Sequence, residues 1–155
     1  MGCQPTVQEG GVAGSGIEAD CRAIAKRFGE SVLSGDWAAA HAMTSPSFRA
    51  RVSKEQMEAG YAELMAMIRE DDPQFLPNAV DTDMGELPDD EADASHNYEI
   101  LNPPPKETWR GWTFAEVGFK APGEDTIERG IDALLLIVEE GNQFTIAWVD
   151  WEFMD

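Results

Sequence analysis

The sequence predicts an α+β domain in which three N-terminal helices pack on a strongly curved, mainly antiparallel C-terminal sheet. Apolar residues recur every three or four positions through the first half, as on one face of a helix, whereas residues 109–155 contain three apolar, aromatic-rich strands. Hydrophobic residues make up 43% of the 155-residue chain and charged residues 26%, a globular balance. A chain of this length can bury a core as a single domain, which we place at residues 16–155.

Residues 1–15 are predicted to form a flexible tail or tether, because they are mostly small and polar. Cys3 directly follows Gly2 and resembles the lipid-modified cysteine of a bacterial lipoprotein, which implies a place in the bacterial cell envelope. Two alternatives stay open. Gly2 to Thr6 also fits a myristoylation pattern with Cys3 as a palmitoylation site, and the segment also fits the ordinary N-terminus of a cytoplasmic protein.

The first helix is predicted over residues 16–34. Ser15-x-x-Glu18 matches a capping box, and Gly35 suits a helix C-terminus. Its apolar stripe comprises Ile17, Cys21, Ile24, Phe28 and Val32. Cys21 is therefore predicted to be a core residue. The sequence contains no Cys-x-x-Cys pair that would indicate a zinc site.

Two more helices are predicted before the first convincing strand. Asp36 can cap a short helix from Trp37 to Met43, which the Thr-Ser-Pro sequence at 44–46 ends in a turn. Ser53-x-x-Gln56 is a second capping box, and the helix that it begins continues until Asp71-Asp72-Pro73.

The middle of the chain is predicted to be mostly irregular. Residues 75–80 read as the beginning of a strand, and residues 81–93 as a solvated loop, because seven of these thirteen residues are acidic. The acidic segment fails the EF-hand calcium pattern, since Ala92 stands at the twelfth position. Residues 96–101 read as a short strand, closed by the prolines at 103–105.

The C-terminal sheet is predicted from three strands at residues 109–121, 127–139 and 143–153, the last two joined by a hairpin around Gly141. The first strand alternates, with Thr113 and Val117 on one side and Trp112 and Glu116 on the other. One face must pack on the helices, so the other needs a second cover. We expect a homodimer through the sheet, with the N-terminal tail as the alternative cover.

The net charge restricts the kinds of molecule that the protein can bind. Thirty acids against eleven bases give a formal charge of −19, which excludes a nucleic-acid binder and suits a solvated acidic surface or a basic protein partner. The sequence contains no phosphate-binding glycine loop or metalloprotease motif, and we predict no cofactor and no metal site.

The run "FGESVLSGDWAAAHAMTSPSFRARVSKEQM", followed by the long C-terminal hairpin, resembles the nuclear transport factor 2-like superfamily, also called SnoaL-like or cystatin-like cone proteins. The resemblance covers residues 17–153 and rests on the order of elements and a Gly-Asp turn. It implies a cone-shaped sheet wrapped around helices with a pocket between them, often in a dimer. Members include ketosteroid isomerases, dehydratases, epoxide hydrolases and non-catalytic binding domains, so the fold alone does not choose the function.

Asp150 is the best candidate for a catalytic group, because it ends a strand face that is otherwise apolar, and burial would raise the pKa of its carboxyl. His41 and Tyr61 are its candidate partners, and Trp37, Tyr61 and Trp148 are candidate ligand-binding residues. The sequence has no catalytic spacing typical of the isomerase, dehydratase or hydrolase branches. We therefore expect a non-catalytic domain that binds a small apolar molecule or a protein partner. The alternatives are a cofactor-free lyase, isomerase or hydrolase that uses Asp150, and an acidic module for a basic partner.

Overall fold

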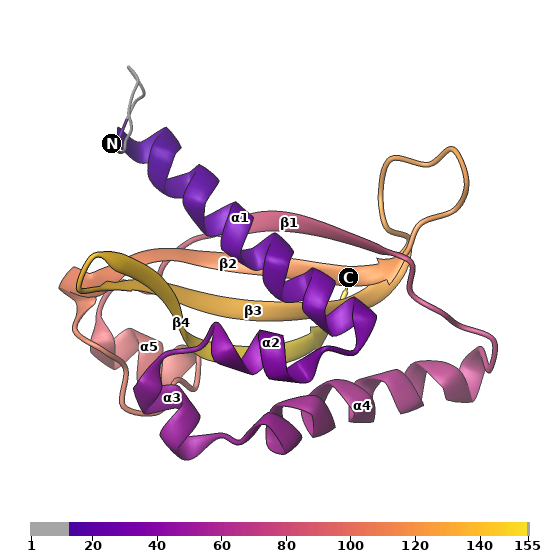
Figure 1. Ribbon diagram of the computed structural model, residues 1–155, viewed down its shortest axis with the longest axis horizontal. Helices are drawn as coiled ribbons and strands as arrows, with labels where there is room; N and C mark the ends of the chain where they lie inside the picture. The colour runs from indigo at the N-terminus through magenta and orange to yellow at the C-terminus, as the bar shows by residue number, and fades with distance from the viewer. Residues whose placement is uncertain (1–12, 155) are drawn as a thin grey trace.

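The computed structural model describes residues 13–154, so Cys3 and the predicted lipid site lie outside the described residues. The domain is α+β, with its helices mainly at the N-terminus and an antiparallel sheet in the order β1-β2-β3-β4. In Figure 1, α1 crosses one side of the sheet, α2 and α4 lie along its lower border, and α5 lies behind it. The elements are α1 (Ala13–Ser34), α2 (Trp37–Ala42), α3 (Pro46–Arg51), α4 (Lys54–Asp71), β1 (Ala79–Gly85), α5 (Glu91–Asn97), the one-turn helix η1 (Lys106–Thr108), β2 (Trp109–Phe119), β3 (Arg129–Glu140) and β4 (Gln143–Phe153).

Helix α1 begins earlier than its capping signal predicts. Its first residue is Ala13, so Ser15 lies inside the helix and not at its N-cap. The apolar stripe is largely confirmed, since Cys21, Phe28 and Val32 are buried, although Ile17 is 36% exposed. The predicted end is also confirmed: Gly35 has a φ of +80° and donates its N–H to the Val32 carbonyl at 3.1 Å.

The turn predicted at residues 44–46 is instead the start of a further helix, α3, so that four helices precede the first strand in the described chain. Ser45 is its N-cap, with the hydroxyl accepting from the Phe48 N–H at 3.2 Å, and Pro46 occupies its first turn. A Ser-Pro pair is typical of both a turn and a helix start. Phe48, 2% exposed, decides between them because it anchors this turn of helix in the core.

Helix α4 begins and ends where its capping box and the Asp72-Pro73 pair predict. The Ser53 hydroxyl accepts from the Gln56 N–H at 3.1 Å, and the Gln56 side chain accepts from the Ser53 N–H at 2.8 Å, which is a complete capping box. The helix ends at Asp71, as the following Asp72-Pro73 predicts.

The prediction of an acidic loop over residues 81–93 is confirmed only for residues 86–90; residues 81–85 belong to a strand and residues 91–93 to a helix. Residues 79–85 form β1, which pairs antiparallel with β2, placing Asp81 opposite Glu116 and Asp83 opposite Phe114. Alternate strand residues point to opposite faces, so Asp81 and Asp83 reach the outer face while Val80 and Met84 pack on the core. Tertiary pairing overrides the low strand propensity of aspartate.

The short strand predicted at residues 96–101 is also wrong. His96 lies in α5, whose N-cap Asp90 accepts from the Asp93 N–H at 2.8 Å, and the chain beyond Tyr98 turns back irregularly. Glu99 and Asn102 adopt positive φ angles of 59° and 47°, a left-handed conformation that a strand excludes.

The final three strands are confirmed to within two residues at every end, and Gly141 makes the β3–β4 turn with a φ of +65°. The side of this sheet that faces the helices, here called the inner face, is packed with aromatic rings. Trp151 lies 5.3 Å from Tyr61, 5.9 Å from Trp37 and 6.1 Å from Phe28, measured between ring centroids. These rings fill space in which the resemblance implied a pocket.

The opposite side, here called the outer face, is covered in part by α5 and the loop after it. Ala94 and Ile100 are buried there against Trp112, Leu134 and Leu136. The second cover that the sequence required is therefore supplied in part by the chain itself. The homodimer through the sheet stays a prediction.

Candidate functional site

A hollow of about 280 Å³ opens on the outer face where the cover formed by α5 stops. We call it the outer pocket. Residues after α5 form one wall, and side chains from β2, β3 and β4 form the floor and the other wall. Its lining consists of Asn97, Tyr98, Glu99, Trp112, Leu134, Asp150 and Glu152.

Aromatic side chains form the rigid part of the outer pocket. The rings of Tyr98 and Trp112 meet at 5.3 Å with an interplanar angle of 85°, and Trp112 meets Phe114 at 6.4 Å and 83°. Such edge-to-face pairs hold each other in place. Trp112 is only 5% exposed, since Ala94 and Ile100 pack in the same cluster. The wall is therefore formed before any ligand arrives.

Three carboxylates, those of Glu99, Asp150 and Glu152, lie around this wall. Asp150 is exposed at the rim and accepts from the Trp151 N–H at 2.9 Å. Partial burial raises the pKa of the Asp150 carboxyl, the hydrogen bond from Trp151 opposes the rise, and the charge of Glu99 adds to it. Glu99 holds its place in a left-handed conformation that costs a non-glycine residue about 1–3 kcal/mol. Backbone strain of this kind is typical of functional sites.

The acidity extends across the sheet beyond the outer pocket. Asp81, Glu116, Asp132 and Glu152 stand directly opposite one another on the four strands and form a transverse row of acids. Burial raises the pKa of the Glu116 carboxyl, and the charges of Asp83 and Asp81 raise it further. The Lys120 ammonium, 3.3 Å from the Asp81 carboxylate, offsets part of this charge.

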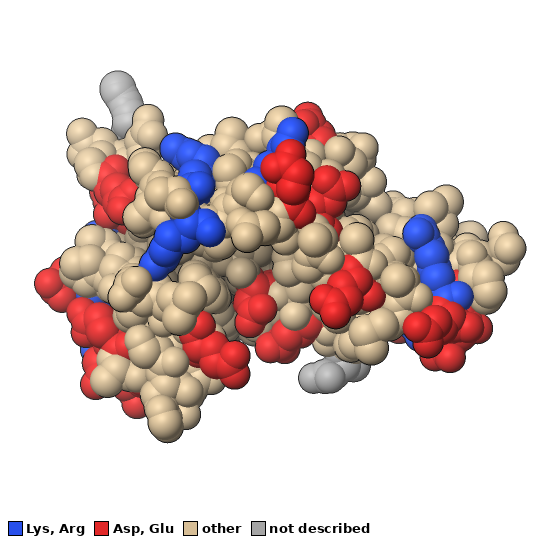
Figure 2. All heavy atoms as spheres, turned by 90° about the horizontal axis from the view of Figure 1, so that it is seen from below, with Lys and Arg blue, Asp and Glu red and all other residues tan. Residues whose placement is uncertain are grey.

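In the described residues, no three His, Cys, Asp or Glu side chains gather closely enough to hold a metal ion. Figure 2 shows from below that acidic side chains predominate over basic ones on another side of the domain as well. The outer pocket thus offers aromatic surface and negative charge, which together suit an organic cation.

The structure does not bring Asp150 together with its predicted partners. Asp150 and Trp151 are neighbours on β4 and point to opposite faces, and Tyr61 packs against Trp151 on the inner face. His41 lies on α2 and forms a hydrogen bond from Nε2 to the Val52 carbonyl at 2.8 Å. The sheet therefore separates Asp150 from Tyr61 and from the helix that carries His41.

The predicted ligand-binding residues divide in the same way. Trp37 and Tyr61 do meet, at 5.5 Å between ring centroids, but as part of the inner packing, where burial raises the pKa of Tyr61 to about 12. Trp148 packs edge-on against Phe48 at 6.0 Å and does not line the outer pocket. Its buried indole N–H has no acceptor within residues 13–154.

Sequence reasoning missed most of the outer pocket. The sequence predicts a strand at Tyr98 and Glu99, and its patterns do not indicate Trp112, Leu134 or Glu152 as site residues. The alternation of β2 and β4 already places Trp112 on one face with Glu116, and Asp150 on one face with Glu152. Only the register between strands shows that these faces are continuous.

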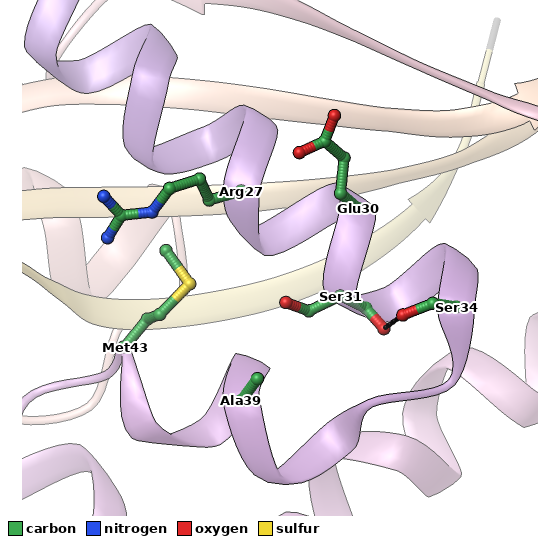
Figure 3. Close-up of a pocket in the computed structure, with 6 residues that line it drawn as sticks. All are labelled: Arg27, Glu30, Ser31, Ser34, Ala39 and Met43. Carbon is green, nitrogen blue, oxygen red and sulfur yellow. Dashed lines mark hydrogen bonds between the residues drawn. The ribbon is translucent and has the colours of Figure 1, made fainter.

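A second hollow, of about 420 Å³, lies between α1 and α2. Figure 3 shows Arg27 projecting from α1 above Met43, and Glu30 projecting from α1 on the side away from Met43. The Ser34 hydroxyl donates to the Ser31 carbonyl at 3.1 Å (Figure 3). This groove is wide and open, and its charged side chains, Arg27 and Glu30, are solvent-exposed. It lacks the preformed wall of the outer pocket.

Comparisons with protein-family models, with curated proteins and with solved structures give no match. None of the helices in the described part of the chain combines the length and apolar character that crossing a bilayer requires.

Proposed function

We propose that this protein is a non-catalytic binding domain whose site is the outer pocket, and that its ligand joins an apolar body to a positive charge. The observation that carries the proposal is the placing of the Tyr98–Trp112 wall beside Asp150, Glu99 and Glu152. The ligand differs from the wholly apolar molecule that the sequence alone suggested, since a neutral occupant would leave the carboxylates without a counter-charge.

The energetics favour a cation. A positive group beside an aromatic ring gains about 0.5–2 kcal/mol, more as the site is desolvated. Charge pairing with Asp150 would also favour its ionised form, which partial burial now disfavours. A formal charge of −19 raises the local concentration of cations around the whole domain. The hollow of about 280 Å³ lies just below the range of about 300–1,000 Å³ for small-molecule sites, so it suits a small ligand or a single side chain.

The same chemistry accommodates a basic protein partner that inserts one arginine or lysine side chain. The membership of the nuclear transport factor 2-like superfamily, the pocket-bearing cone, the homodimer and the lipid anchor on Cys3 remain proposals alongside this one. The cone would have to hold its ligand outside the packed inner face, because Trp37, Tyr61 and Trp151 occupy the space beneath the helices.

A catalytic function is the second candidate, supported by the raised pKa of Asp150 at the rim of the outer pocket. Such an enzyme would use Asp150 without His41 or Tyr61. General acid–base catalysis needs a group within hydrogen-bond reach of the reacting proton, and binding requires no second group. We therefore propose binding.

The test is a nuclear magnetic resonance titration that follows the backbone N–H signals of Tyr98 and Leu134, which line the outer pocket and are present in every variant. The probes are tetramethylammonium and N-acetyl-arginine amide, with tert-butanol as a neutral probe of similar shape. We expect saturable shifts with the two cations, and at least tenfold weaker binding in Trp112→Leu and Asp150→Asn, equivalent to about 1.4 kcal/mol.

The control is Asp125→Asn, a charge removal in the exposed β2–β3 loop that should bind as tightly as the wild type. Equal binding of tert-butanol would contradict the requirement for charge. Cation binding that Trp112→Leu and Asp150→Asn leave unchanged would place the site elsewhere.

A further inference from the structure

The sheet is open, so β1 and β4 each present an edge, and these edges lie at the top and bottom of the sheet in Figure 1. An edge strand turns the main-chain groups of every second residue away from its neighbour, and these groups can pair with a strand of another molecule. The contacts that occupy these groups therefore decide whether the protein can extend its sheet.

On β1, charged side chains occupy the outward groups. The Arg22 guanidinium donates to the Thr82 carbonyl at 3.0 Å, and the Met84 N–H donates to the Asp83 carboxylate at 2.9 Å. Thr82 and Met84 are two residues apart and therefore project to the same edge. Arg22 is itself held by an ion pair with Glu18, at 3.0 Å.

On β4, the first half of the edge is covered by main chain and the second half by a carboxylate. The Ile146 N–H donates to the Met43 carbonyl at 3.1 Å, and the Ile146 carbonyl accepts from Ser45 at 2.7 Å. Farther along, the Trp151 N–H donates to the Asp150 carboxylate at 2.9 Å. Each edge thus carries an aspartate bound to the N–H of the residue that follows it.

We propose that Asp83 and Asp150 are edge guards, which hold an outward N–H of β1 and of β4 and prevent a second copy of this chain from adding to the sheet by strand pairing. An incoming strand would have to displace each carboxylate and desolvate it, and would bring its own guards toward the same charge. The second copy is the relevant occupant, because its exposed edges match these in length and hydrogen-bonding pattern. This role of Asp150 is independent of ligand binding in the outer pocket.

Two paired substitutions separate the hydrogen bond from the charge. Asp83→Ala with Asp150→Ala removes both, whereas Asp83→Asn with Asp150→Asn keeps an oxygen acceptor and removes the charge. Asp125→Ala and Asp125→Asn are the matched controls, since Asp125 is exposed in the β2–β3 loop. Circular dichroism establishes that each variant is folded, and the asparagine pair keeps the test valid if the alanine pair does not fold.

Sedimentation velocity over a concentration series at neutral pH measures association relative to the wild type. We expect the weight-average mass of the alanine pair to double or more, the asparagine pair to rise less, and the controls to match the wild type. Hydrogen exchange should then show new protection in β1 or β4 of the associated species. Folded guard variants with the wild-type mass at every concentration, or association without added protection at either edge, would overturn the proposal.

Discussion

The two faces of the sheet are formed by the same alternating strands, but they differ in burial and in charge. On the inner face, Ala115, Ala133 and Leu135 are buried at 0% exposure under the helices. On the outer face, Glu116 and Asp132 belong to the transverse row of acids, and Leu134 lies in the floor of the outer pocket. The inner face therefore contributes more to the free energy of unfolding, whereas the outer face is charged and partly accessible to solvent.

The difference has a physical cause. Apolar burial contributes about 25 cal/mol per Å² removed from water. On the inner face, Phe28, Phe48 and Trp37 are at most 8% exposed. Acids placed directly opposite one another across strands oppose this gain by a few tenths of a kcal/mol or more per pair. A face that carries such a cost is the better place to look for a partner of opposite charge.

The largest effect should come from alanine substitution of neighbouring leucines on β3. Leu135→Ala should lower the free energy of unfolding by about 3–5 kcal/mol, because it leaves a cavity in the inner packing. Leu134→Ala should cost about 2 kcal/mol, since the outer pocket already adjoins that side chain and water can enter the space. Urea denaturation measures both, and equal costs would break the comparison between the faces.

A glycine pair tests how tightly the inner face is packed. A Cβ on Gly60 of α4 would lie 2.7 Å from Cδ1 of Trp151, so Gly60→Ala should destabilise the protein by about 1–3 kcal/mol despite the better helix propensity of alanine. Gly16 of α1 has open space around it, and Gly16→Ala should stabilise by up to about 1 kcal/mol. Thermal unfolding of the two variants gives the signs, and a stabilised Gly60→Ala protein would show that Trp151 moves freely.

On the outer face, removal of one acid from the transverse row should stabilise the fold. Glu116→Gln relieves repulsion with Asp83 and Asp81 and should raise the free energy of unfolding by about 0.5 kcal/mol at neutral pH and low salt. Glu140→Gln, at the exposed end of β3, is the control and should change little. Added salt should reduce the difference between Glu116→Gln and the wild type; a destabilised Glu116→Gln protein would mean that the row is already neutralised.

The smallest effect is the pH dependence of that gain. The pKa of Glu116 is raised in the folded state, so the folded protein binds more protons than the unfolded chain between the two pKa values. The wild type therefore recovers stability from this group as the pH falls through the folded pKa, fully below the unfolded value of about 4.3. The advantage of Glu116→Gln should shrink over this range in paired thermal melts, and a growing advantage would reverse the assigned direction.

Much of the backbone follows from local signals. Capping at Ser53, the glycine at position 35 and the alternation of β2 act within a few residues, and each is confirmed. The predictions are wrong where a local sequence fits two structures equally well, as Ser45-Pro46 fits both a turn and a helix start. They are also wrong where acidic composition favours a loop but the residues form a strand, as in β1. The sequence singles out Asp150 as the end of an apolar strand face, but a shift in the pairing of β3 with β4 puts Phe144 and Ile146 on the inner face and Asp150 on the outer face. Glu99 lies in a left-handed turn that no local motif predicts.

By itself, the sequence determined the α+β order, most helix and strand limits and the strong negative charge, because periodicity, caps and composition are properties of neighbouring residues. The tertiary structure alone decided that β1 pairs with β2, that α5 covers part of the outer face, and that Trp112 lies in the same pocket as Asp150. These contacts join segments far apart in the chain. Their register depends on which combination of faces buries the most apolar surface, a sum over the whole domain that no single segment contains.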